Sequence, residues 1–257
     1  MTANDGNLNP SRRKRRKRRE WLEQPAYLLP GLPIVPAMFS IFDIKIEGKL
    51  PQYGAAVVAS NHVTLIDPTV VGSAIWRQGR APKILVKASL WKVPVIGWLL
   101  ERTGQIPVER ETGGAVAREA AAEALERGSL VLIYPEGTLT RDKNLWPMRG
   151  KTGAVRLAAK ANIPLYPVAH WGTHEWLEPN SKRPKWRIGR VPVTVKFGDP
   201  IDISDVVADP DNNELVRQKT DELMREIARL VGEIRDEQPP ATLHDPRGDA
   251  PKPNQGS

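Results

Sequence analysis

Residues 116–134 read VAREAAAEALERGSLVLIY, and this stretch decides the fold class. The part before Gly128 is rich in Ala, Glu and Arg, which favour a helix, and a glycine is a typical residue to end one. The part after it, Ser129–Tyr134, is almost entirely apolar, which is typical of a short strand buried on both faces. A helix followed at once by such a strand is the building unit of an α/β protein.

The same alternation extends in both directions from this stretch. We expect further strands at 55–59, 83–87, 105–109, 165–169 and 191–197, and further helices at 68–77, 152–161 and 213–235. The sequence therefore predicts one α/β domain over residues 55–236, with a mostly parallel central sheet flanked by helices. Ligands of such sheets bind beyond the carboxyl ends of the strands, so the loops that follow the strands are the places to search for function.

The two ends of the chain differ from this body in composition. Residues 1–20 are polar and charged, and residues 237–257 are rich in proline, so we expect both to be disordered tails. Residues 12–19 are all Lys or Arg, and without them the remaining charges balance, so the net charge of +8 comes from this basic run. The chain has no cysteine, which excludes disulfides, a thiolate metal site and a cysteine nucleophile.

Residues 21–54, between the basic run and the domain, are predicted to be an N-terminal membrane-interfacial segment. The most apolar part, 27–42, is too short to span a bilayer and contains three prolines. Cations followed by apolar residues indicate an anchor on an anionic membrane surface, although a nucleic-acid arm and a solvated tail are alternatives. We expect a peripheral or monotopic protein on the cytoplasmic face of the cell membrane, with no nucleic-acid partner.

The loop after the 55–59 strand contains Asn61, His62 and Asp67, and Pro68 follows. On a regular helix, residues five apart do not face each other. Because a helix is expected to begin at Pro68, residues 62–67 should form a loop that can fold His62 back onto Asp67. A carboxylate on one imidazole nitrogen leaves the other free to act as a base. The alternative is that Asp67 only caps the helix and His62 is only a polar loop residue.

Two other loops offer polar groups at the same edge of the expected sheet. Tyr134–Thr138 (YPEGT) follows the most apolar strand, and Gly137 permits a tight backbone there. Arg110 follows the 105–109 strand, where an arginine suits bidentate phosphate binding or, alternatively, a surface salt bridge. Each signal is weak when it is taken alone.

Taken together and in order, these loops resemble the motifs of the membrane-associated glycerophospholipid acyltransferases, which include the 1-acylglycerol-3-phosphate acyltransferases. The first motif of that family, N-H-x4-D, is matched at Asn61, His62 and Asp67. The later motifs are matched by Lys87, Leu90, Pro94, Gly97, Gly104 and Arg110, by Tyr134–Thr138, and by Ile163, Pro164, Pro167 and Val168. The matches cover about residues 55–170, most of the expected domain.

The resemblance implies transfer of a fatty acyl group from acyl-CoA or acyl-carrier protein to a hydroxyl of lysophosphatidate or a related glycerol-phosphate lipid, in phospholipid biosynthesis. The Ala- and Pro-rich composition, taken separately, indicates a bacterial source. It makes His62 and Asp67 catalytic and implies no metal and no cofactor beyond the acyl carrier. The substrate-binding residues implied are Asn61, Lys87, Arg110, Glu136, Gly137, Thr138 and Arg141. Alternatives are another acceptor, such as glycerol 3-phosphate, a monoacylglycerol or a glycolipid, and a non-catalytic lipid-binding protein.

One departure concerns the acceptor. Many relatives have an arginine directly after E-G-T, whereas this chain has Leu139, with Arg141 two residues further on. Either Arg141 takes over the role, or the acceptor is held differently. Because Glu136 is itself negative, we expect it to orient an arginine or the loop rather than to contact a phosphate.

The apolar stretch 90–100 is flanked by cations and interrupted by Pro94 and Gly97. It is too short to cross a bilayer. A second interfacial contact, a lid over the acyl chain and an ordinary core helix all fit the pattern.

Overall fold

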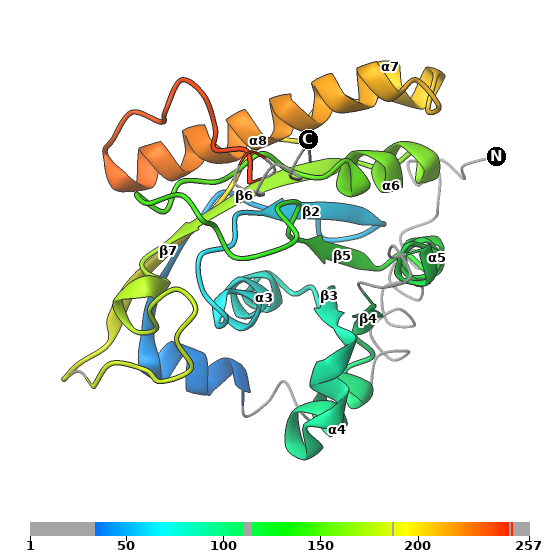
Figure 1. Cartoon of the computed structure of the whole chain (residues 1–257). Coiled ribbons are helices and arrows are strands. Elements are labelled where there is room, and N and C mark those ends of the chain that lie inside the picture. Colours follow the sequence, from blue (N-terminus) through cyan, green and yellow to red (C-terminus); the bar gives the residue numbers. More distant parts are fainter. Residues whose placement is uncertain (1–33, 110–114, 187, 247, 249–257) are drawn as a thin grey trace, which may run out of the picture.

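A single sheet of seven strands organises the fold, in the order β1-β7-β6-β2-β5-β3-β4. The computed structural model describes residues 34–109, 115–186, 188–246 and 248 (Figure 1). All paired neighbours are parallel except β6 and β7, which are antiparallel. The strands are β1 (Phe42–Glu47), β2 (Ala56–Ser60), β3 (Pro82–Lys87), β4 (Ile106–Val108), β5 (Leu130–Ile133), β6 (Leu165–Trp171) and β7 (Val191–Phe197).

Helices cover both faces of this sheet. A short helix at residues 34–41 precedes β1. The other helices are α3 (Asp67–Arg77), α4 (Pro94–Arg102), α5 (Ala115–Glu126), α6 (Gly153–Ala161), α7 (Ser204–Ala208) and α8 (Asn213–Arg235), with short 3-10 helices η2 (Ala88–Lys92) and η3 (Thr173–Glu175). Figure 1 shows α6 and α8 above the sheet and α3 below it. The expected α/β class with a mostly parallel central sheet is confirmed.

The central strands are apolar throughout because the sheet is covered on both sides. On β2, Val57 belongs to the core shared with α5, α6 and α8, while its neighbour Val58 belongs to the core shared with α3. On β5, Val131 and Leu132 divide between the same two cores. Every residue of β2 and β5 is buried. The sequences of these strands are continuously apolar because both faces of the sheet are covered.

The assignment of residues 42–47 to a membrane-interfacial segment is wrong, because they form β1. This strand pairs with β7 in parallel, with Phe42 opposite Val191. Phe42 is completely buried, and its ring meets Trp176 edge-on at 5.4 Å between centroids. The alternating sequence FDIKIE explains the strand. Residues 1–33, with the basic run, lie outside the described residues, as does Arg110.

Residues 237–246 lie against the domain, whereas the sequence indicated that the chain is disordered from residue 237. The backbone N–H of Arg149 donates to the carbonyl of His244 over 2.9 Å. The Arg149 guanidinium also pairs with Asp245 at 3.0 Å. Leu243 also packs against the core. The segment is therefore held by a few polar contacts and one apolar side chain, too few to stand out in its proline-rich composition.

Within the described ranges, none of the helices combines the length and the apolar character that a membrane crossing requires.

Candidate active site

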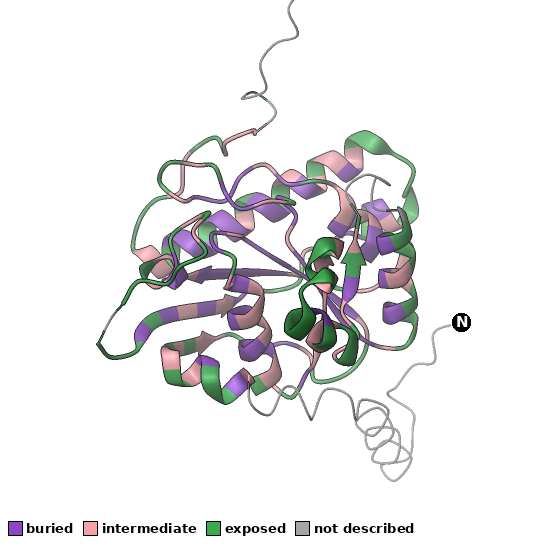
Figure 2. Ribbon diagram, turned by 60° about the horizontal axis from the view of Figure 1, so that its bottom comes forward, coloured by how far each residue is buried: buried purple, intermediate pink, exposed green. Residues whose placement is uncertain are grey.

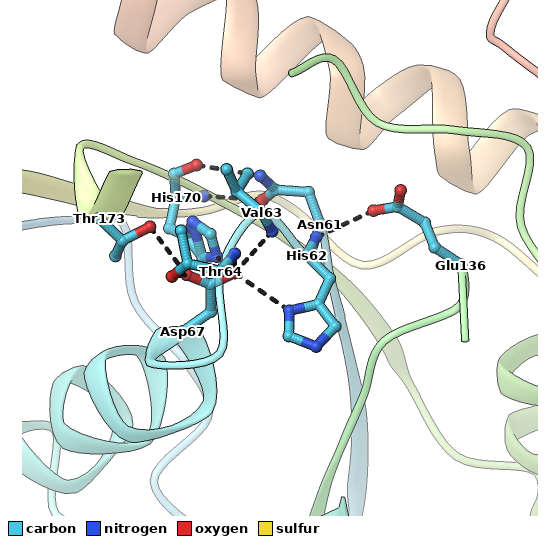
Figure 3. Close-up of polar contacts among 8 residues, drawn as sticks. All are labelled: Asn61, His62, Val63, Thr64, Asp67, Glu136, His170 and Thr173. Atoms are coloured by element: carbon cyan, nitrogen blue, oxygen red, sulfur yellow. Dashed lines mark hydrogen bonds and ion pairs between the residues drawn. The ribbon is translucent and has the colours of Figure 1, made fainter. Parts of the chain in front are cut away.

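The loop between β2 and α3 brings His62 and Asp67 together, as predicted. Nδ1 of His62 lies 3.0 Å from Oδ2 of Asp67 (Figure 3). The Asp67 side chain is fully buried, while the His62 side chain is slightly exposed. Since Nδ1 faces the carboxylate, Nε2 is the ring nitrogen left for a substrate.

The Asp67 carboxylate is held by a shell of donors from two parts of the chain. Its Oδ2 accepts the backbone N–H groups of Val63, at 2.6 Å, and of Thr64, at 2.7 Å. Its Oδ1 accepts the hydroxyls of Thr64, at 2.6 Å, and of Thr173, at 2.8 Å. The N-cap position of α3 is Ile66, without a side-chain capping bond, so the carboxylate organises the histidine loop rather than capping the helix.

These contacts fix the charge of Asp67. Burial raises the pKa of this carboxyl, but the nearby His170 ring and the hydrogen bonds from His62 and Thr64 outweigh burial and bring the pKa down to about 2. Asp67 is therefore ionised at neutral pH, and it can stabilise a positive charge on His62.

His170, on β6, lies next to the Asp67 carboxylate. Its side chain is completely buried, and Nε2 is 3.2 Å from Oδ2 of Asp67. Burial lowers the pKa of His170, so the ring is neutral at neutral pH. The side-chain amide of Asn61 donates to the His170 carbonyl over 3.0 Å and accepts the His170 N–H over 2.9 Å. The fully buried Asn61 thus joins the histidine loop to β6, in place of the substrate contact that was expected of it.

Glu136 connects the histidine loop to the Y-P-E-G-T loop. Its Oε1 accepts the His62 backbone N–H over 2.9 Å, and its Oε2 accepts the Met148 N–H over 3.1 Å. The side chain is only 3% exposed, and burial raises its pKa to about 8, although the two N–H donors oppose the shift. Glu136 therefore orients loops, which agrees with the expectation that it does not contact a phosphate.

Tyr134 forms one wall beside the base. Its ring centroid lies 4.2 Å from that of His62, with the two planes inclined by 31°. Its hydroxyl is buried and finds no hydrogen-bond partner within the described part of the chain. Burial raises the pKa of this phenol well above its usual value, so the ring is an uncharged neighbour of His62.

A cation that the motifs did not indicate lies next to the Y-P-E-G-T loop. Gly137 has a φ of +71°, and a Cβ on it would lie only 2.8 Å from Nζ of Lys151. The backbone N–H of Lys151 donates to the Pro135 carbonyl over 2.8 Å, which fixes the residue beside this loop. No ion pair of Lys151 is found among the residues that the structure describes. Its position after the glycine of the Gly150-Lys151-Thr152 sequence was the only available signal.

The remaining expected binding residues differ in their surroundings. Lys87 and Arg141 are exposed, and Thr138 is half-buried. Leu139 is buried, so the residue in the place of the usual arginine belongs to the interior. The Arg141 backbone N–H approaches Sδ of Met148 at 3.1 Å.

The arrangement provides a base, His62, and a carboxylate that orients it, Asp67, both from the segment after the carboxyl end of β2. Glu136, from the loop after β5, holds the backbone of this segment. Thr173 and His170, from the end of β6 and the turn after it, complete the surroundings of the carboxylate. Such a site can remove a proton from a hydroxyl and stabilise the resulting imidazolium.

Comparison with known proteins agrees with this chemistry. The family model described as Acyltransferase matches residues 42–171, from the first residue of β1 to the last of β6. The chain therefore belongs to the acyltransferase family.

Individual relatives carry more specific names. The chain is 29% identical over 204 residues to a 1-acyl-sn-glycerol-3-phosphate acyltransferase of Haemophilus influenzae, covering 77% of this chain and 80% of that protein. It is 30% identical over 170 residues to the enzyme of that name from Limnanthes douglasii, covering 65% of this chain and 57% of that protein. A lyso-ornithine lipid O-acyltransferase of Pseudomonas aeruginosa is 32% identical over 158 residues, covering 61% of this chain and 54% of that protein. The chain thus spans little more than half the length of two of these three relatives.

Among solved structures, the 1-acyl-sn-glycerophosphate acyltransferase PlsC from Thermotoga maritima matches with a TM-score of 0.59 and 22% sequence identity. The match covers 88% of this chain and 85% of the other. It shows that the two proteins share the fold.

Proposed function

We propose that this protein is an O-acyltransferase that moves a fatty acyl group from a thioester to a hydroxyl of lysophosphatidate. The observation that carries the proposal is the 3.0 Å contact between Nδ1 of His62 and Oδ2 of Asp67, in a chain of the acyltransferase family. The acyl donor is acyl-CoA or acyl-carrier protein. The relatives from Haemophilus and Limnanthes support the acceptor through their names.

The chemistry follows from the geometry of the pair. Nε2 of His62 accepts the proton of the acceptor hydroxyl while the oxygen attacks the thioester carbonyl, and the ionised Asp67 stabilises the imidazolium. The tetrahedral intermediate then collapses, the carbon–sulfur bond breaks, and the leaving thiolate takes the proton back from His62. Base catalysis of this kind contributes about 10²- to 10⁴-fold. No acyl-enzyme forms on this route.

The acceptor phosphate is expected to lie near the Y-P-E-G-T loop. Lys151 brings an ammonium to Gly137 there, and the exposed Arg141 lies further along the same loop. The ammonium group of a lysine commonly binds phosphate. Lys87, exposed at the end of β3, is a further candidate for the phosphates of the acceptor or of the acyl carrier.

A second candidate is acylation of a lysolipid other than lysophosphatidate. Two observations favour it. The position after E-G-T is the buried Leu139, and the Pseudomonas relative, at 32% identity, carries the name lyso-ornithine lipid O-acyltransferase.

Because the acceptor is a lipid, the protein is expected to work on a membrane surface. The basic run 12–19 and the apolar residues after it are suited to an anionic leaflet. We place the protein on the cytoplasmic face of the cell membrane, as a peripheral or monotopic enzyme of phospholipid biosynthesis.

The test is turnover by the purified full chain. Acyl-CoA and acyl-carrier protein are each supplied with lysophosphatidate, glycerol 3-phosphate, monoacylglycerol or lyso-ornithine lipid, and the products are identified by mass spectrometry. We expect phosphatidate from lysophosphatidate and at least about a 100-fold loss of kcat in His62→Ala, with an unchanged circular dichroism spectrum. Absence of product with every acceptor, or full activity of His62→Ala, contradicts the proposal.

A further inference from the structure

The hairpin made by η2 and α4, residues 88–102, turns its apolar side chains outward. A helix of a soluble protein normally buries its apolar stripe. In α4, however, Gly97 is the single buried position, whereas Val95 is 77% exposed and Trp98 54% exposed. Figure 2, in which the bottom of Figure 1 comes forward, shows α4 mostly in the colour of exposed residues. The large apolar residues exposed in this hairpin are Leu90, Val93, Val95, Ile96 and Trp98.

The hairpin holds these residues in place. A Cβ on Gly97 would lie 2.2 Å from the Trp91 carbonyl oxygen, so α4 packs against η2 at van der Waals contact. The Gly97 N–H also donates to the Val93 carbonyl over 2.6 Å. Only glycine allows this close approach of α4 to η2. The approach fixes the orientation of α4, in which Val95 and Trp98 point outward.

Cations surround the apolar residues. Lys87, Lys92 and Arg102 are exposed, while Glu101 is the one acidic residue between positions 87 and 102. The guanidinium carbon of Arg102 lies 5.6 Å from the centroid of the Trp98 ring. Tryptophan with neighbouring cations at the border of an apolar patch is typical of surfaces that meet the headgroup region of an anionic bilayer.

The hairpin also lies at the catalytic edge of the sheet. It begins directly after β3 ends at Lys87, and the histidine loop begins directly after β2 ends at Ser60. Since β2, β5 and β3 are parallel neighbours, their carboxyl ends lie at one edge. A membrane that meets the hairpin is therefore on the side from which a lipid reaches His62.

We propose that the η2–α4 hairpin is the surface by which this protein docks onto an anionic phospholipid bilayer, with Val95 and Trp98 entering the headgroup region. The proposal rests on the proposed function, because an enzyme that acylates a membrane lipid must meet the bilayer at its catalytic edge. It specifies a surface that the resemblance to relatives does not specify. Large exposed apolar patches mark such contacts, and the charges select a bilayer over a second copy of the chain.

The test uses flotation of the full chain with vesicles of phosphatidylcholine and phosphatidylglycerol in equal parts. High salt screens the basic run 12–19, so the apolar contribution remains. The double variant Val95→Glu/Trp98→Glu is expected to bind about tenfold or more weakly than the wild type under these conditions. The matched control is Tyr53→Glu, because Tyr53 is also exposed but precedes β2, at the opposite edge. It is expected to bind like the wild type.

A second readout uses the tryptophan itself. Vesicles with brominated acyl chains are expected to quench the fluorescence of the wild type, and Trp98→Phe should lose part of this quenching. Equal flotation of the double variant and the wild type overturns the proposal. Equal quenching of the vesicle-bound wild type and Trp98→Phe also overturns the proposal, because Trp98 then does not meet the bilayer. Dimerisation that depends on Trp98, measured by analytical ultracentrifugation, overturns it as well, because a second copy of the chain then covers the hairpin.

Failure of the proposed function gives a different result. Turnover of a short-chain lysophosphatidate below its critical micelle concentration does not require a bilayer, so the double variant is expected to match the wild type in that assay. If the wild type shows no turnover with any acceptor, the proposed function fails, while the flotation result still decides the docking surface.

Discussion

The backbone N–H of His62 donates to Oε1 of Glu136 over 2.9 Å, so the loop that carries the base is attached to the loop that follows β5. The other oxygen of Glu136 accepts the Met148 N–H. The histidine loop and the segment around Met148 are thus held by one buried carboxyl group. Its removal should disturb the position of His62 without touching the imidazole.

The variant Glu136→Gln tests this arrangement. Glutamine offers a single acceptor oxygen, so either the His62 or the Met148 N–H faces an NH₂ group. We expect a free energy of unfolding lower by about 1–3 kcal/mol, measured by urea denaturation, together with a lower kcat. A variant with unchanged stability and kcat would show that the two N–H bonds to Glu136 are dispensable.

The stability difference between wild type and Glu136→Gln should also depend on pH. Burial raises the pKa of Glu136 from 4.5 to about 8, so between these values the native state holds a proton that the unfolded chain has released. This proton stabilises the native state fully below the pKa that Glu136 has in the unfolded chain. The stabilisation is lost as the pH rises through the pKa that Glu136 has in the native state. Glutamine lacks this dependence. The difference in free energy of unfolding between the wild type and Glu136→Gln, measured by urea denaturation, is therefore expected to decrease from pH 4.5 to about 8. An increase in this difference contradicts the raised pKa of Glu136.

Thr173→Val removes one donor to the carboxylate of Asp67. The Thr173 hydroxyl is buried and donates to Oδ1 of Asp67 over 2.8 Å. A hydrogen bond to a charged group contributes about 1.5–3 kcal/mol, so we expect a loss of stability of that order and a lower kcat with little change in KM. Thr173→Ser keeps the hydroxyl and should retain most of the wild-type kcat. Equal kcat values for the valine and serine variants would rule out a role of the hydroxyl.

Asp67→Asn should impair both catalysis and folding. Asparagine has one acceptor oxygen in place of two, and it cannot stabilise an imidazolium by charge. We expect kcat to fall by about 10²- to 10⁴-fold and the free energy of unfolding by about 1–3 kcal/mol. His62→Ala should reduce kcat comparably while leaving stability close to the wild type. Steady-state kinetics and urea denaturation of the two variants separate the two effects, and a fully active Asp67→Asn excludes a role of the carboxylate in stabilising the imidazolium.

Lys151→Met tests the cation beside Gly137. If the ammonium binds the acceptor phosphate, KM for lysophosphatidate should rise about tenfold, while KM for a monoacylglycerol should not change. Lys151→Arg keeps the charge and should recover part of the affinity. An equal rise in KM for both acceptors indicates that Lys151 supports the loop rather than the phosphate.

The fold class and the contact between His62 and Asp67 could be predicted from the sequence because both depend on local patterns. The apolar runs of β2 and β5 reflect burial on both faces, and Pro68 indicates where α3 begins. The residues that support Asp67 could not be predicted in this way. Thr173 lies 106 positions from Asp67, and only the pairing of β6 with β2 brings the two together.

The roles of several motif residues also needed the structure. The family resemblance implied that Asn61 contacts substrate, but its amide nitrogen and oxygen both bond to the backbone of His170. Similarly, the sequence of the stretch 90–100 left a core helix, a lid and an interfacial contact all open. Periodicity gives the face of a helix, but only the packing around Gly97 shows that this face points outward.

The position of β1 decides how the domain can be shortened. A fragment that starts at residue 55, where the apolar pattern begins, lacks the strand that pairs with β7 along six residues. Its backbone N–H and C=O groups on that side of β7 would have no partner, and Val191 and Trp176 would lose the cover of Phe42. Open strands of this kind recruit other chains, so such a fragment should aggregate during expression. Deletions from the amino end should therefore stop before β1 begins at Phe42.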